Sequence, residues 1–148
     1  MRQNKLFKSN ERGSTLVEYS IAATVFLTAM FGVIEFGRAL WVHNALADAA
    51  RRGARYAVLH SANDVDEVKN VVVYGDPAGG TKTTVPNLST ANVTVNYSGF
   101  ALNKGTVSVS VTNYQFQFVI PLVGTTITMP SYTTTLTGES VGFIPADM

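Results

Sequence analysis

The chain has 148 residues, of which 46% are hydrophobic, with a formal net charge of +1 and no cysteine. This length suits one modest domain with an appendage, and the lack of cysteine excludes a disulfide framework or a thiolate metal site. Eight of the eleven basic residues precede His60, whereas three basic residues and six acids follow it. This segregation favours two environments along the chain over a nucleic-acid surface, so we expect no nucleic-acid partner.

The first part of the chain combines a basic segment with an apolar run. Residues 1–13 carry four basic residues and one acid, which is typical of a targeting segment. Residues 19–34 contain no charge and would form about 24 Å of helix, slightly short of the ~30 Å hydrocarbon core of a bilayer. The span becomes long enough over about 16–38, where Glu35 and Arg38 lie three residues apart and can pair.

An ordinary secretory signal peptide, cut at the far end of the apolar run, is the alternative to a membrane-spanning helix. The run is longer than the usual apolar region of about 7 to 15 residues, and the helical pattern continues beyond it. No proline occurs before Pro77, and strong helix formers dominate residues 41–59, with Asp48 placed to pair with Arg52. The sequence therefore predicts one helix from about Thr15 to about Leu59.

Basic residues flank the apolar run equally, so the positive-inside count does not decide its orientation. Four lie near each end, namely Arg2, Lys5, Lys8 and Arg12 against Arg38, Arg51, Arg52 and Arg55. The last three are distant from the run and are followed by the bulk of the chain, which favours an N-terminus in the cytoplasm. We interpret these three arginines as a solvated face; an acidic partner or lipid headgroups are the alternative.

Small residues recur at four-residue intervals on the outer half of the helix. They are Ala45, Ala49, Gly53 and Ala57. Such a row lets another backbone approach closely. The favoured interpretation is that a sheet of the same chain packs on it, and the alternative is a helix of another subunit.

The chain changes character after Leu59. Ser61 and Asp64 predict a capping box that opens a short helix over residues 64–72, although the β-branched valines there make a strand at its end equally defensible. The neighbouring acids lack the glycine and final glutamate of a calcium loop, so capping is the better interpretation and no metal site is expected. Residues 75–87 are rich in glycine and proline and predict a loop.

From Asn92 onward hydrophobic residues alternate with polar ones, which predicts antiparallel strands with one buried face. Two such runs contain Val93, Val95 and Tyr97, and Val107, Val109 and Val111. The phase then slips to Tyr114, Phe116 and Phe118, which predicts a bulge or bend near Thr112 and Asn113. A last strand is expected over about Thr125 to Leu136, with an edge or break at Pro130.

Two segments carry a family resemblance. The run from Gly13 through Ser14 to Glu18 and Tyr19 resembles the cleavage motif of type IV prepilins of the Flp kind, in which a glycine precedes the cut and a glutamate with an aromatic neighbour follows. The segment "GVIEFGRALWVHNALADAARRGARYA", residues 32–57, resembles the core of TadE-like pseudopilins of the Tad (tight adherence) pilus and secretion machinery.

The resemblance implies an α+β, pilin-like fold, in which a long N-terminal α-helix with a membrane-spanning first half packs on a small antiparallel sheet. The alternating strands agree with it. The expected parts are a basic leader at residues 1–13, the long helix at 14–60 and an extracytoplasmic β-rich domain at 61–148.

The resemblance also implies that a prepilin peptidase cuts between Gly13 and Ser14, where a small residue lets the active site approach the backbone. Otherwise Gly13 is only a helix breaker and no cut occurs. The new ammonium group of a neighbouring subunit would then dock on Glu18, beside Tyr19, and remove the cost of two unpaired charges in the membrane. The alternative role of Glu18 is to complement the positive end of the helix dipole, worth about 0.3 to 1 kcal/mol.

No residue pattern supports catalysis. His43 and His60 have no acid at ligand spacing, and we expect His43 to be an interfacial side chain. We therefore expect neither an enzyme nor a cofactor, but a minor pilin or pseudopilin. Its expected partners are the prepilin peptidase, the major pilin and other pilus subunits, and the cytoplasmic membrane. The alternative is a stationary single-pass anchor whose external β domain binds another component of the apparatus.

Overall fold

The computed structural model describes residues 11–99, 105–119 and 126–138. The expected leader therefore lies almost wholly outside the described residues. The chain divides into two compact units, unit 1 at Met1–Gly37 and unit 2 at Arg38–Met148. The division falls inside one helix, so the outer part of that helix belongs to the same unit as the strands.

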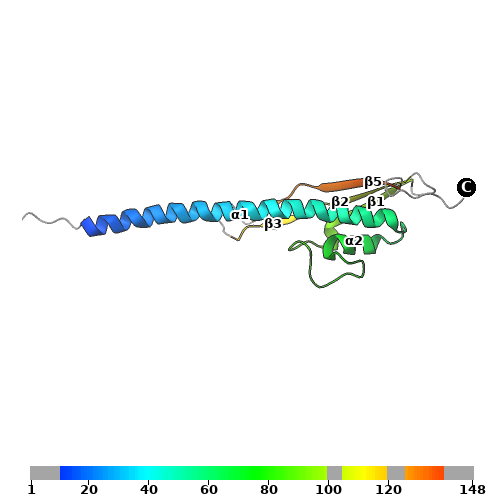
Figure 1. The fold of residues 1–148 in the computed structure, drawn as a ribbon, viewed down its shortest axis with the longest axis horizontal. Helices are drawn as coiled ribbons and strands as arrows, with labels where there is room; N and C mark the ends of the chain where they lie inside the picture. Colours follow the sequence, from blue (N-terminus) through cyan, green and yellow to red (C-terminus); the bar gives the residue numbers. More distant parts are fainter. Residues whose placement is uncertain (1–10, 100–104, 120–125, 139–148) are drawn as a thin grey trace, which may run out of the picture. The chain divides into compact units, whose positions relative to one another are not determined.

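Helix α1 spans Glu11–Leu59, 49 residues in all (Figure 1). It ends where the sequence predicts, and residues 11–14, before the expected start at Thr15, are already helical. Gly13 does not end the helix, because a single glycine costs only about 1 kcal/mol relative to alanine. Among the described residues, α1 is the one helix long and apolar enough to cross a membrane.

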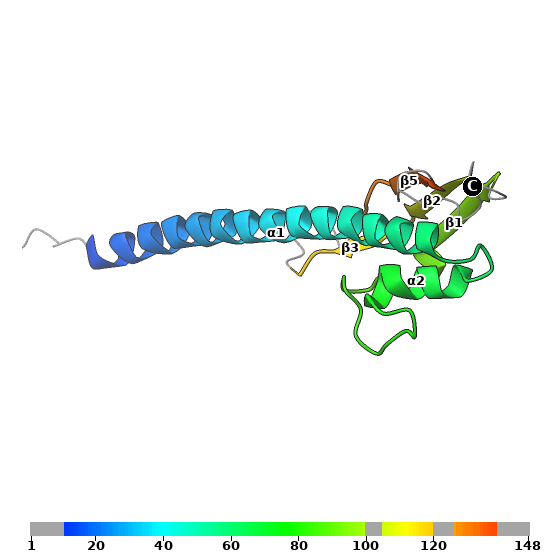
Figure 2. The same ribbon diagram turned by 45° about the vertical axis from the view of Figure 1, so that its right-hand side comes forward.

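Unit 2 contains a three-stranded antiparallel sheet in the order β1-β2-β5. The strands are β1 at Val93–Ser98, β2 at Thr106–Val111 and β5 at Tyr132–Thr137. Val109 in the central strand pairs with Val95 on one side and Thr134 on the other. The sheet and helix α2 (Val65–Tyr74) flank the outer part of α1 (Figure 2), so unit 2 has an α+β fold.

The predicted break near Thr112 and Asn113 marks the passage from this sheet to a second one. Asn113 adopts a left-handed conformation with φ of 56°, and the Thr112 N–H donates to the Asn92 carbonyl oxygen at 2.8 Å. The chain then forms β3, Gln115–Gln117, which pairs with β4, Thr126–Thr128. The expected last strand is thus two strands, β4 and β5, because the proline between them has no N–H to donate to a ladder.

Helix α2 spans Val65–Tyr74 and remains helical to its end, so the alternative of a strand there is wrong. The predicted capping box is also wrong. Asp64 occupies the N-cap position without a side-chain capping bond, while the Ser61 hydroxyl accepts a hydrogen bond from the Asn63 N–H at 3.2 Å. A turn formed by Ser61 therefore precedes the helix, and Gly75, with φ of 79°, terminates it.

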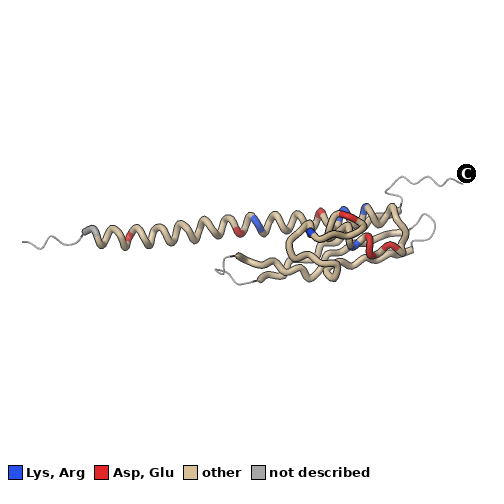
Figure 3. Tube along the Cα trace, turned by 90° about the horizontal axis from the view of Figure 1, so that it is seen from below, with Lys and Arg blue, Asp and Glu red and all other residues tan. Residues whose placement is uncertain are grey.

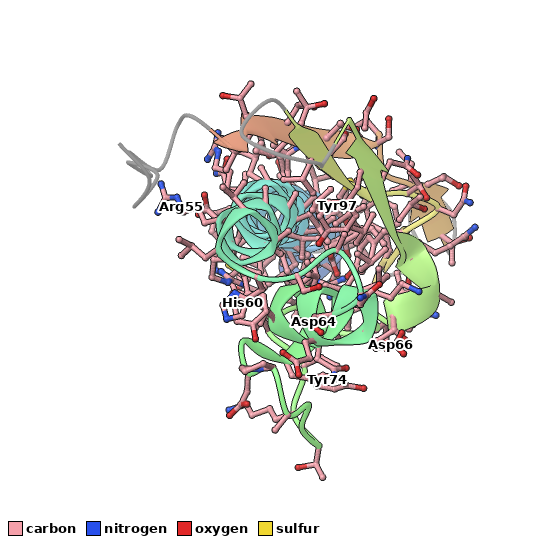
Figure 4. All side chains as sticks on the ribbon, turned by 90° about the vertical axis from the view of Figure 1, so that its right-hand side faces the viewer. Arg55, His60, Asp64, Asp66, Tyr74 and Tyr97 are labelled. Atoms are coloured by element: carbon pink, nitrogen blue, oxygen red, sulfur yellow. The ribbon has the colours of Figure 1, made fainter. Side chains whose placement is uncertain are left out.

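The core of unit 2 lies between the outer part of α1, α2 and the sheet. Figure 4 views it along α1, with Tyr97 among the side chains between the helix and β1. The fully buried aliphatic contributors include Leu46, Ala49, Ala50, Ala54, Ala57, Val68, Val72, Val73, Val85, Val107 and Val109. On α1, Gly53 lies against Val72 of α2 and Val109 of β2, so the absence of a side chain there lets these elements approach closely.

Candidate functional site

The expected processing site lies within α1, close to the first described residue of the chain. Gly13 and Ser14 are both exposed, and no atom lies within 4 Å of the position that a Cβ atom at Gly13 would occupy. A larger side chain would therefore fit this helix without a clash. If residue 13 must be small, the requirement comes from a molecule that binds the chain.

The apolar part of α1 in unit 1 exposes hydrophobic side chains all round, the pattern of a helix that is surrounded by lipid or by other helices. Its exposed members include Leu16, Val17, Ile21, Val25, Phe26, Val33 and Ile34. The hydroxyls within it are satisfied locally: Ser20 donates to the Leu16 carbonyl and Thr24 to the Ser20 carbonyl, both at 2.8 Å. Such bonds suit an apolar environment, where an unsatisfied hydroxyl is costly.

Glu18 and Tyr19 are exposed on this apolar surface, and Tyr19 is 72% exposed. Within the part of the chain that the structure describes, the Glu18 carboxylate makes no hydrogen bond or ion pair. The geometry therefore leaves this carboxylate available to a group outside the chain.

The outer row of small residues packs within unit 2. Ala49 and Ala57 are fully buried, and a Cβ atom at Gly53 would lie 2.3 Å from Val72 Cγ2 and 3.3 Å from Val109 Cγ1. Both α2 and β2 thus approach Gly53 closely, and the nearer contact comes from α2, which the expectation of a covering sheet did not include. Ala45 is the partly exposed member, beside a hollow of about 340 Å³ that Trp41, Asp48 and Arg52 also line.

The arginines that follow on α1 are exposed. Asp48 pairs with Arg51, at 2.8 Å between Oδ1 and Nη1, and not with Arg52 as expected. Both spacings place the partners on one helical face, and the observed pair uses the three-residue spacing. Both side chains are 61% exposed, so this pair contributes at most about 1 kcal/mol.

The two histidines serve contacts within unit 2. His43 Nδ1 lies 2.7 Å from the Tyr132 hydroxyl and joins α1 to β5, so His43 is at an interface inside the unit. His60 stacks on Tyr56 with ring centroids 3.7 Å apart. The Tyr56 hydroxyl donates to Glu67 Oε2 at 2.6 Å, and this hydrogen bond to a carboxylate raises the pKa of Tyr56 to about 12.

Arg38 has a role that the sequence did not reveal. Its guanidinium lies 4.5 Å from the centroid of the Phe116 ring and donates a hydrogen bond to the Gln117 carbonyl oxygen. Arg38 therefore ties the start of the outer part of α1 to β3. The sequence offers no signal for this, because the partners are 79 residues apart.

Comparison with known families tests the resemblance. Residues 13–55 match the model of the TadE-like protein family. This segment of the chain is TadE-like. The match begins at the glycine of the motif and ends inside the outer part of α1, and it confirms the predicted relationship. No curated protein and no solved structure matches the chain.

A TadE-like segment is consistent with a protein of Tad pilus systems. The family is in general not enzymatic. The apolar N-terminal helix is compatible with a membrane anchor. The family match covers only part of α1, and the strands lie outside the matched segment.

Proposed function

We propose that this chain is a minor pilin or pseudopilin of a Tad-type pilus or secretion apparatus, cut by prepilin peptidase between Gly13 and Ser14 and assembled through its apolar helix. The observation that carries the proposal is the TadE-like match over 13–55, which starts at Gly13 and includes the whole exposed apolar run. The proposed role needs no catalytic residue and no cofactor.

The proposed cut lies directly after a glycine of α1. Glycine lowers the helical preference by about 1 kcal/mol relative to alanine, so the backbone opens there more easily than at its neighbours. The sequence and structure together therefore support Gly13 as the place where the leader can unwind into an active site.

The processing proposal is tested by the mass of the mature chain. In cells that contain the peptidase, the product should begin at Ser14, and Gly13→Leu should remain uncut in the membrane. Gly32→Leu is the matched control, because Gly32 is equally open on the same helix and its variant should be cut. A product that begins after residue 30, or cleavage of Gly13→Leu, would contradict the proposal.

The proposed assembly step uses the exposed carboxylate of Glu18. A charge left alone among apolar helices is costly, so docking of a neighbour's N-terminal ammonium favours the assembled state. Glu18→Leu should be processed normally but should no longer co-purify with the major pilin. The neighbouring Val17→Leu is the control, and it should be processed and should still co-purify. Normal co-purification of Glu18→Leu would contradict the docking step. The remaining role of Glu18 would then be to complement the positive end of the helix dipole.

We further propose a single-pass arrangement in the bacterial cytoplasmic membrane before assembly, with the N-terminus in the cytoplasm and unit 2 outside. The basic segment before the apolar run and the compact core after it support this orientation. Cysteine labelling offers a direct test, since the chain has no native cysteine. A cysteine at Ser108 should react with an impermeant reagent added outside the spheroplast, and one at Ser9, placed in the uncut Gly13→Leu precursor, should not.

A stationary anchor is the second candidate, because unit 2 covers its own row of small residues and so leaves less of α1 for contact with other subunits. Its external strands would then bind another component of the apparatus. Shearing distinguishes the two functions: a fibre subunit should appear with the released filaments in small amounts, whereas an anchor stays entirely in the membrane while filaments form normally.

A further inference from the structure

Unit 2 carries its exposed apolar side chains mainly at one end. Among its described residues five large hydrophobic side chains are exposed, and four of these adjoin Arg38 or strands β3 and β4: Leu40, Trp41, Val119 and Ile127. We call these four the apolar end. Trp41 and Val119 line one hollow of about 240 Å³ together with Arg38 and Phe118.

The direction of the strands relative to α1 follows from three contacts within unit 2. Val109 of β2 lies against Gly53, and Tyr132, the register partner of Val111, contacts His43. Phe116 and Gln117 of β3 contact Arg38. As the chain advances from β2 to β3, its partners on α1 move backward from residue 53 to residue 38.

Phe118 and Val119 follow β3 and therefore lie toward the N-terminal end of the helical segment that starts at Arg38, where both line the hollow beside Arg38. The chain bends at Val119, which is 74% exposed. Ile127 pairs with Phe116 across the second sheet and is 51% exposed, so β4 and the residues directly after β3 each present an apolar side chain at this end.

Charged residues are distributed as unevenly within unit 2 as its exposed hydrophobic residues. Residues 105–138 contain no acidic or basic residue, and the strands are uncharged throughout in Figure 3. Arg38 is the cation at the apolar end, and its contacts with Phe116 and Gln117 hold it beside the hairpin. A tryptophan, an arginine and exposed aliphatic residues together are the side chains that favour the boundary between headgroups and acyl chains.

We propose that the apolar end is a lipid-binding surface, on which Trp41, Val119 and Ile127 enter the interfacial region of the bilayer that α1 crosses. The inference rests on the proposed membrane-spanning role of α1 and adds a second contact between the chain and the membrane. Arg38 ends the apolar run and is bound to β3, so the lipid contact of the helix continues onto the hairpin. Arg38 then lies at the level of anionic headgroups.

Trp41 makes the proposal measurable, because it is the one tryptophan of the chain. The full chain is placed in vesicles of phosphatidylcholine and phosphatidylglycerol, with part of the lipid brominated either near the headgroup or deep in the acyl chain. Trp41 emission should be quenched more by the shallow bromines. The other positions are tested in a Trp41→Phe background. Brominated lipid should quench the emission of Val119→Trp and Ile127→Trp about as much as that of Trp41, and it should quench Leu59→Trp little.

Leu59 is the matched control, since it is 64% exposed at the other end of this helical segment. If Trp41 is quenched but the tryptophans at 119 and 127 behave like that at 59, the lipid-binding surface is refuted and the membrane-spanning helix stands. If the tryptophans at 119 and 127 emit at short wavelength without quenching, a second copy or another protein covers the hairpin, which also overturns the proposal. If Trp41 itself is unquenched and the chain is released by alkaline carbonate, the proposed membrane role of α1 fails.

Discussion

Gly32 and Gly53 lie on the same helix in opposite surroundings. A Cβ atom at Gly32 would have no neighbour within 4 Å, whereas one at Gly53 would collide with Val72. The apolar part of α1 in unit 1 exposes its side chains, so groups outside the described chain would have to cover them, while the outer part buries its small residues in a core of its own chain. One continuous helix thus combines a segment that depends on its environment with a segment that does not.

The largest effect that separates the two regions is expected from a charge in the core of unit 2. Val109 is fully buried beside Val95 in the sheet and lies against Gly53 of α1, so Val109→Asp places an uncompensated carboxylate there and should destabilise the unit by about 3–5 kcal/mol. Ser108→Asp, on the polar face of the same strand, is the matched control. Loss of protease resistance in unit 2 with unchanged cleavage at Gly13 is the expected result; an equally resistant Val109→Asp chain would refute it.

The two glycines themselves provide the next prediction. Gly53→Ala should destabilise unit 2 by about 1–3 kcal/mol. The added methyl group would overlap the Val72 side chain, and α1 or α2 would have to shift to relieve this contact. Gly32→Ala should stabilise α1 slightly, by at most about 1 kcal/mol, through helix propensity alone. Thermal unfolding of the two variants in one detergent checks both, and a Gly53→Ala chain as stable as the parent would show that α2 moves aside.

Much of this contrast is visible in the sequence, because it depends on local periodicity. The uncharged run at 19–34, the row from Ala45 to Ala57 and the phase slip after Val111 each predict their structure from side chains close in sequence. The apparent capping box at Ser61 failed because a serine can equally close a turn before a helix. The contacts of Arg38 and His43 join residues 79 and 89 positions apart, and local patterns do not determine such pairings.

A moderate effect is expected where α1 joins β5. Tyr132→Phe removes the hydroxyl that bonds to His43 Nδ1 but retains the edge-to-face contact of the rings, whose centroids are 5.1 Å apart. The loss should be about 1 kcal/mol, the usual net value of one hydrogen bond. Denaturant unfolding of Tyr132→Phe, His43→Phe and the double variant tests the pair, and strictly additive losses would show that the two side chains do not interact.

The smallest expected effect is the pH dependence at the junction of α1 and α2. The hydrogen bond to Glu67 raises the pKa of Tyr56 to about 12 in the folded chain, above its ordinary value of about 10. The folded state therefore keeps a proton that the unfolded state loses in this window, so the stabilising contribution is complete below about pH 10 and disappears as the pH rises toward about 12.

The stability of unit 2 should accordingly fall between these pH values, and less steeply in Tyr56→Phe than in the parent. Glu67→Gln should reduce the slope in the same way, because it removes the carboxylate that holds the proton, and the double variant should show no further change. Urea midpoints measured across this range decide the matter. If Tyr56→Phe and the parent lose stability in parallel, the Tyr56–Glu67 bond does not persist in solution, and the junction is held by the stacking of Tyr56 on His60 and by the buried valines of α2 alone.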